Sequence, residues 1–116
     1  MKKITTKNAP AAIGPYSQGI ISGDFVYCSG QIPVNPETGL PAEGGIEAQA
    51  EQSCKNVAAV LEAAGTGMDK VVKTTCFLAD MADFAVFNEV YAKYFVSNPA
   101  RSCVAAKSLP KMFYAK

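Results

Sequence analysis

The stretch Asn98-Pro99-Ala100-Arg101-Ser102-Cys103-Val104 organises the second half of this chain. Asn98 precedes a proline, whose ring disfavours the helical conformation in the residue before it, so a preceding helix ends here. The run from Ser102 to Ala106 is small and apolar, which is typical of a short buried strand. Arg101 stands at the start of that strand, where a lone buried charge is costly. We therefore expect its guanidinium to bind a carboxylate or to lie in a wet cleft, the alternative being an ordinary exposed arginine.

The composition predicts one soluble, cytoplasmic domain that spans residues 1–116. The net charge is +1 and the basic residues form no cluster, which argues against nucleic acid as a partner. No apolar run of a secretory signal follows Met1, and none approaches the ~20 residues that cross a membrane. We therefore expect no membrane partner.

Four cysteines and the absence of histidine limit the available chemistry. Cys28, Cys54, Cys76 and Cys103 are too far apart in sequence for a zinc or redox motif, so we expect buried free thiols. Without histidine the chain lacks the commonest general base and the commonest transition-metal ligand. Any chemistry must then rely on carboxylates, tyrosine, thiol, lysine, backbone groups or bound water.

The N-terminal part of the chain predicts short strands. Residues 4–6 are expected to form an edge strand. Two apolar runs, residues 19–22 and 25–30, flank Gly23-Asp24 and predict a β-hairpin. Gly30 ends the second run, at a point where the backbone can approach a ligand closely.

Two helices and two further strands are predicted next. Residues 46–64 carry apolar or small side chains at helical spacing, which predicts an amphipathic helix. Residues 71–78 are rich in β-branched side chains and predict a strand. Asp80 or Asp83 is the expected cap of a second helix, which ends at about Val96.

The second predicted helix carries an aromatic stripe that we interpret as core rather than as a cofactor site, formed by Phe84, Phe87, Tyr91 and Tyr94. The resulting order, β-β-β-α-β-α-β, predicts an α+β fold with both helices on one face of a mixed β-sheet. The opposite face of the sheet needs a cover, which self-association supplies most simply.

Three segments, taken together with Asn88, resemble the Rid (YjgF) family in its RidA subfamily: Gly14-Pro15-Tyr16-Ser17-Gln18, Ser29-Gly30-Gln31-Ile32-Pro33 and Pro99-Ala100-Arg101-Ser102-Cys103-Val104. The resemblance implies a chorismate-mutase-like α+β fold assembled as a homotrimer, with equivalent sites in the clefts between subunits. It implies hydrolysis of reactive enamines and imines, such as 2-aminoacrylate and 2-iminopropanoate, to a 2-keto acid and ammonia. This would make the chain a 2-iminobutanoate/2-iminopropanoate deaminase that needs no cofactor and no metal.

The same resemblance implies roles for individual residues. Arg101 would bind the substrate carboxylate through two hydrogen bonds, which suits the fork of its guanidinium. Tyr16 would close the cleft and offer a hydroxyl, and the backbone at Ser29 and Gly30 would contact the substrate.

Two further assignments concern backbone and amide groups. Backbone groups at Cys103 would hold the imine nitrogen or the attacking water. The thiol of Cys103 is not expected to be a nucleophile, because nothing in the sequence activates it. Asn88 is expected to contact the substrate, or else to be an ordinary amide on the helix surface or behind the site.

The chain departs from the family pattern after Pro110. RidA chains continue there into a last strand of alternating pattern, whose first glutamate is thought to position the hydrolytic water. Here Lys111-Met112-Phe113-Tyr114-Ala115-Lys116 follows, with Lys116 at the matching position, so we expect a truncated last strand. Loss of a general base of this kind costs ~10²–10⁴-fold in rate, which predicts a weakened enzyme. We also expect the trimer to persist with reduced stability.

Two other functions are weighed against deamination. The first is a non-catalytic trimer that binds small carboxylates or partner proteins in the same clefts. The second, ribonuclease or translation-inhibitor activity, is disfavoured by the near-neutral charge and by the lack of histidine and of a basic groove.

Overall fold

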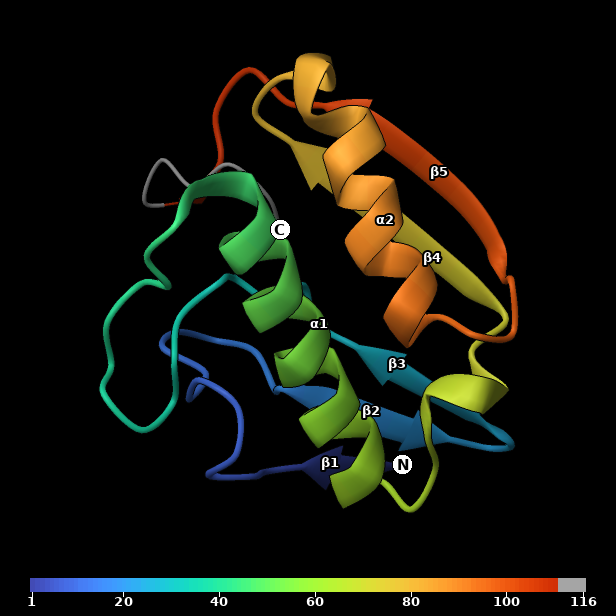
Figure 1. Cartoon of the computed structure of the whole chain (residues 1–116). Coiled ribbons are helices and arrows are strands. Elements are labelled where there is room, and N and C mark those ends of the chain that lie inside the picture. Colours follow the sequence, from blue (N-terminus) through green and yellow to red (C-terminus); the bar gives the residue numbers. More distant parts are fainter. Residues whose placement is uncertain (111–116) are drawn as a thin grey trace.

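The computed structural model describes residues 1–110 and has the α+β architecture expected from the sequence, with two α-helices laid against short strands (Figure 1). In chain order the elements are β1 (Lys2–Ile4), β2 (Gly19–Ser22), β3 (Phe25–Cys28), α1 (Gly45–Ala63), η1 (Met68–Lys70), β4 (Lys73–Leu78), η2 (Met81–Asp83), α2 (Phe84–Tyr94) and β5 (Ala100–Ala105), where η denotes a 3₁₀ turn. The predicted truncation of a last strand falls on residues 111–116, which lie outside the described residues. None of the helices within residues 1–110 is long and apolar enough to cross a membrane.

The strands form two sheets, where the sequence pattern suggested a single mixed sheet. β1, β2 and β3 make an antiparallel sheet, whereas β4 and β5 pair in parallel. β3 and β4 line opposite parts of a cavity of about 840 Å³, and no other strand of the described chain pairs with their free edges. Backbone groups at such edges need water or another segment as hydrogen-bond partners.

The predicted hairpin is present between β2 and β3. Gly23 lies in its turn with a φ of 59°, a left-handed conformation that glycine adopts without strain. Gly19 opens β2 at a point where the strand approaches α1 closely. A Cβ atom at Gly19 would lie 3.0 Å from a methyl group of Val60, so this position leaves no room for a side chain.

β1 begins and ends earlier than predicted. It covers Lys2–Ile4, where residues 4–6 were expected, and only Ile4 of the three is buried. The N–H of Thr6 donates to Oε1 of Gln18 at 2.7 Å, so the chain leaves the sheet and turns toward that side chain. The N–H of Thr6 thus donates to a side chain and not to the backbone of a neighbouring strand, which is why residues 5 and 6 are not part of β1.

α1 lies close to its predicted bounds and carries a buried asparagine that fastens the preceding loop. Asn56 is 1% exposed, and its Nδ2 donates to the carbonyls of Ile32 and Val34 at 3.0 Å each. Its Oδ1 accepts from Nε2 of Gln52 at 2.9 Å. One amide therefore holds the loop between β3 and α1 against the helix.

α2 follows the 3₁₀ turn η2, so capping by aspartate occurs ahead of the α-helix itself. Asp80 accepts a hydrogen bond from the N–H of Ala82 at 2.8 Å and caps η2, whereas Asp83 makes no side-chain cap. The helix ends at Tyr94, ahead of the chain reversal at Asn98, whose φ of 51° is left-handed. After this reversal the chain enters β5 at Ala100.

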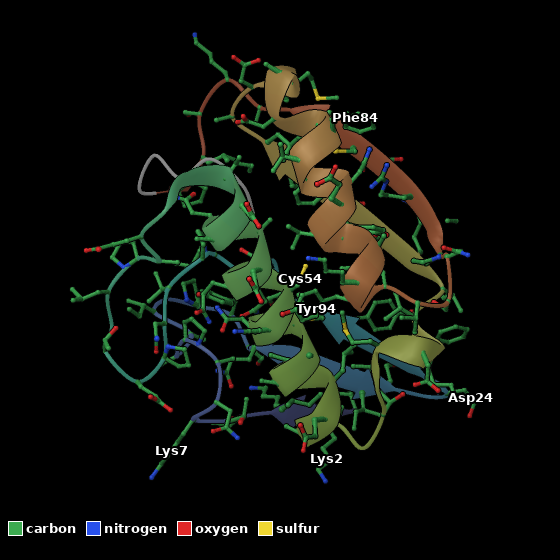
Figure 2. The ribbon with its side chains drawn as sticks, viewed as in Figure 1. Lys2, Lys7, Asp24, Cys54, Phe84 and Tyr94 are labelled. Atoms are coloured by element: carbon green, nitrogen blue, oxygen red, sulfur yellow. The ribbon has the colours of Figure 1, made fainter. Side chains whose placement is uncertain are left out.

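α1 contributes to both parts of the core. Val60, near its C-terminal end, packs with Ile4 and Ala9 on the three-stranded sheet. Figure 2 shows Cys54 between the two helices and Tyr94 reaching toward α1, where its hydroxyl donates to Glu51 at 3.1 Å. Beneath α1 and α2 the parallel strand pair closes the larger cluster, whose buried members are Ala50, Cys54, Cys76, Leu78, Phe87, Val90, Tyr91 and Phe95.

The four cysteines are free, as predicted, and burial keeps their thiols protonated. Burial raises the pKa of Cys54 from 9.0 to about 12 and the pKa values of Cys28 and Cys76 to about 11. A thiolate in these surroundings would lose its hydration, so the folded chain holds each thiol proton more tightly than the unfolded chain does.

We expect Asn56→Ala to lower the free energy of unfolding by about 2–4 kcal/mol, because the buried carbonyl of Val34 loses its donor, the carbonyl of Ile32 loses one of two, and the buried amide is removed. Urea denaturation followed by circular dichroism measures the change. Gln52→Ala, which removes only the third bond from a half-buried side chain, is the matched control and should cost less than about 1 kcal/mol. Equal losses in the two variants would contradict the assigned role of Asn56.

We expect stability to fall in alkali because the thiol pKa values are raised on folding. Below pH 9 both states hold these protons, so this contribution is fully present. Above pH 9 the unfolded chain releases protons that the folded chain keeps, and the free energy of unfolding falls by about 1.4 kcal/mol per pH unit for each buried thiol. Denaturant titrations between about pH 8 and 10.5 measure this slope. Cys54→Ala should make the slope shallower, and an unchanged slope in that variant would refute the assignment.

Candidate functional site

Arg101 is the second residue of β5, and its side chain lies on the face of the strand that α2 covers. Its Nη1 donates to Oδ1 of Asn88 on α2 at 2.7 Å. The guanidinium is half-buried, yet no acidic side chain within residues 1–110 forms an ion pair with it. Of the two predicted surroundings, a carboxylate or a wet cleft, residues 1–110 supply no carboxylate from the protein itself. An amide oxygen takes one N–H donor and leaves the positive charge without a counter-charge.

Two aromatic rings of α2 lie against the same guanidinium. The Cζ atom of Arg101 is 4.7 Å from the ring centroid of Tyr91 and 5.4 Å from that of Phe84. Both rings belong to the stripe that was predicted as core; Tyr91 is indeed buried, but its ring also contacts the cation. Phe84, Asn88 and Tyr91 follow one another at steps of four and three residues, so they share one stripe of the helix. This spacing is the feature of the sequence that could have indicated that the two rings lie beside Asn88.

Tyr91 is also tied to the strand beside Arg101. Its hydroxyl lies 2.6 Å from Oγ1 of Thr74, and Thr74 is the register partner of Arg101 in β4. Burial is the main cause that raises the pKa of Tyr91, while the hydrogen bond to Thr74 lowers it. The phenol therefore stays protonated at neutral pH and takes part as a neutral ring with one hydrogen bond.

The Cys103 thiol lies near Arg101 but is not activated. It follows Arg101 by two residues on the same face of β5, and its register partner is Cys76. Burial raises the pKa of Cys103, and the opposing effect of the Arg101 charge is the smaller of the two. The thiol is therefore protonated at neutral pH, in agreement with the expectation that it is no nucleophile.

The backbone of Cys103 faces away from β4. The N–H groups of Ala100 and Ala106 donate to the carbonyls of Val72 and Leu78, so these residues of the β5 segment point toward β4. Backbone groups alternate in direction along a strand, which turns the N–H and C=O of Cys103 to the other edge. No strand within the described residues pairs on that side, so both groups lie at an open edge.

Tyr16 and Ser29 lie elsewhere, beside the three-stranded sheet. They line a cavity of about 620 Å³ together with residues of the neighbouring loop and of β2 and β3. The Ser29 hydroxyl donates to the carbonyl of Ser17 at 2.6 Å, and its N–H donates to the carbonyl of Gln18 at 3.0 Å. These bonds fix the loop that carries the exposed Tyr16. Gly30 follows Ser29, and both residues also line the larger cavity between the sheets, together with Tyr91.

Gln18 anchors that loop from beneath. It is 4% exposed, and its Nε2 donates to the carbonyls of Thr6 and Pro10 at 3.0 and 2.9 Å. Its Oε1 accepts from the N–H of Thr6. The glutamine of the Gly14–Gln18 motif therefore holds the N-terminal segment and the loop together, a structural role that the sequence analysis did not assign.

Within the described chain the predicted site residues fall into two groups. Asn88 touches Arg101, and Cys103 follows on the same strand. Tyr16 and Ser29 share the smaller cavity, and none of the first three residues is among those that line it. The described chain thus joins Arg101 to Asn88 and leaves the second group on the other sheet.

Comparisons with known proteins agree over nearly the whole chain. The family model described as Endoribonuclease L-PSP matches residues 6–114. A 2-iminobutanoate/2-iminopropanoate deaminase of Salmonella typhimurium is 53% identical over 114 residues, which cover 95% of this chain and 88% of the relative. The crystal structure of Escherichia coli TdcF with bound serine is 44% identical, with a TM-score of 0.94 over 99% of this chain and 93% of that one. RidA from an Antarctic Psychrobacter is 44% identical, with a TM-score of 0.94 over 99% of this chain and 94% of that one.

Sequence and fold therefore agree, and the three segments that carried the resemblance all fall within the matched residues. The chain belongs to the Rid (YjgF) family.

Proposed function

We propose that this protein hydrolyses reactive 2-enamine and 2-imine intermediates, such as 2-aminoacrylate and 2-iminopropanoate, to a 2-keto acid and ammonia. The observation that carries the proposal is Arg101, whose half-buried guanidinium binds Asn88 and meets no acidic side chain in the described chain. A positive fork held in this way suits the carboxylate that these substrates carry. The Salmonella relative is a deaminase of this class, and the serine bound by TdcF carries the same kind of carboxylate.

The reaction needs positioning more than strong acid–base groups. Water adds to the carbon of the C=N bond, and the resulting carbinolamine loses ammonia to leave the ketone. Arg101 would fix the carboxylate beside that carbon and so orient it against β5. For a substrate that is already electrophilic, orientation of this kind can account for a large part of the rate enhancement.

Cys103 would act through its backbone. Two residues along a strand correspond to about 6–7 Å, which suits a small acid whose carboxylate meets Arg101 and whose nitrogen or attacking water lies near Cys103. The N–H and C=O of Cys103 offer one donor and one acceptor at the open edge of β5. Lys116, at the position of the family's glutamate, lies outside the described residues, and we infer a slower enzyme than the full family pattern would give.

We further propose that the protein is a homotrimer with its sites between protomers. The sheet faces opposite the helices carry exposed aromatic side chains, among them Phe25, Tyr27 and Phe77. A second copy would cover this apolar surface, which monomeric proteins rarely leave exposed. The same association would bring the Tyr16 and Ser29 group of one protomer to the Arg101 group of the next. The assembly would thereby reunite the residues that one protomer keeps apart.

We infer a cytoplasmic location from the redox state of the cysteines. All four are free thiols, and such thiols persist in a reducing compartment. We therefore place the enzyme in the cytoplasm.

We expect the wild-type protein to accelerate release of ammonia from 2-aminoacrylate generated in situ. Arg101→Ala should abolish the acceleration, and Arg101→Lys should lose at least about tenfold, because lysine keeps the charge but not the fork. Lys55→Ala removes an equal charge from an exposed i,i+4 pair on α1 and should leave the rate unchanged.

The same assay separates catalysis from simple binding. If the wild-type protein binds pyruvate but does not accelerate ammonia release, the non-catalytic binder is the correct function. If Arg101→Ala hydrolyses as fast as wild type, the assignment of Arg101 is wrong.

We expect light scattering with size exclusion to give the mass of three chains. Phe77→Lys should shift the mass to the monomer and reduce activity, because a charge would enter the proposed interface. Val86→Lys is the matched control: Val86 on α2 is 38% exposed, as is Phe77, but lies on the helical layer. A monomeric wild type, or a trimer that tolerates Phe77→Lys, would contradict the assembly.

A further inference from the structure

We propose that Tyr91, with Phe84 beside it, is a positioning residue that fixes the plane of the Arg101 guanidinium. The inference rests on the proposed role of Arg101 as the carboxylate-binding residue. Both ring centroids lie within the range of a cation–π contact, at 4.7 Å for Tyr91 and 5.4 Å for Phe84. Such contacts stabilise the cation without consuming any of its N–H groups.

An arginine that binds a carboxylate must have its charge stabilised and must also keep its N–H donors free, and here different groups meet these two requirements. The donors of a guanidinium lie in its plane and point outward, whereas a ring attracts the cation through its π face. Asn88 takes one in-plane N–H of Arg101 at 2.7 Å. The other donors have no hydrogen-bond partner among residues 1–110, so the rings hold the charge while the fork stays available.

Tyr91 is itself fixed on two sides. Its hydroxyl is 2.6 Å from the hydroxyl of Thr74, which stands next to Arg101 across the parallel strand pair. Its ring stacks on Phe95, with centroids 4.3 Å apart and planes 22° from parallel. A ring held in this way cannot swing aside, so the guanidinium above it has one preferred orientation.

Core packing alone does not account for these contacts. Packing explains why Tyr91 is buried, but a leucine of α2 could also fill that space. Phe87 is buried on the same helix, and its ring centroid lies 5.8 Å from that of Tyr91, yet its ring does not contact Arg101. It therefore has the core role of Tyr91 without the cation contact. Phe87→Leu is therefore a control for loss of an aromatic core side chain.

The test measures binding of pyruvate, used as a stable carboxylate probe, by isothermal titration calorimetry on the full-length protein. Tyr91→Leu should weaken pyruvate binding by roughly tenfold, in line with a partly desolvated cation–π contact. Tyr91→Phe keeps the ring and should bind within about twofold of wild type. Phe87→Leu should also bind within about twofold, although it loses core packing.

Each outcome decides the proposal. If Tyr91→Leu binds pyruvate as wild type does while Arg101→Ala does not, Tyr91 does not position Arg101, and the proposed function stands. If Arg101→Ala itself binds normally, the proposed function fails first. If Tyr91→Leu does not fold, Phe84→Leu at the half-buried start of α2 replaces it, with an expected weakening of about threefold. Unchanged binding in Phe84→Leu would then overturn the proposal.

Discussion

The structure depends on one half-buried positive charge that is held without a negative one. A cation that leaves water must regain its solvation from the protein, and a carboxylate is the usual source. Within residues 1–110 Arg101 instead receives an amide oxygen and two ring faces, all from α2. An internal carboxylate would have neutralised the charge and occupied the fork. The arrangement therefore keeps the arginine ordered and still able to bind an anion.

This constraint accounts for the packing of the C-terminal half of the chain. Phe84, Asn88 and Tyr91 can meet one strand residue only if α2 lies across the parallel pair, as Figure 1 shows. The parallel register sets Thr74 beside Arg101, so the tyrosine that supports the guanidinium is hydrogen-bonded to the neighbouring strand. In the N-terminal half, Gln18 and Ser29 fix the loop that carries Tyr16. The proposed trimer would bring this loop of one protomer to Arg101 of the next.

Local elements were predictable from the sequence where short-range physics decides them. The hairpin follows from two apolar runs around Gly23-Asp24, and α1 follows from apolar spacing that a core can bury on one side. β1 was misplaced because the glutamine that ends it, Gln18, lies far along the chain. The sequence pattern suggested a single mixed sheet, but β3 and β4 do not pair in the described residues, because strand pairing between distant segments depends on long-range geometry that residue patterns do not encode.

The site was predictable in part. The neighbourhood of Arg101 suggested a carboxylate or a wet cleft, because a lone buried charge is costly, whereas the contacts with an amide oxygen and two aromatic rings appear only in the structure. Asn88 was identified through the family resemblance, with its contact to the arginine unknown. Tyr91 was assigned to the core alone, since an aromatic residue on an apolar stripe gives no sign that its ring also faces a charge. That second role exists only once α2 lies on β5.

The central claim is that the free in-plane donors of Arg101 bind the substrate carboxylate. Nuclear magnetic resonance of the arginine side-chain N–H groups, with pyruvate added to the intact protein, tests it most directly. We expect pyruvate to shift the signals of Arg101, the only arginine of the sequence, strongly and to protect them from exchange with water, with much smaller changes at the lysine side chains. Saturating pyruvate that leaves the Arg101 signals unmoved would contradict it.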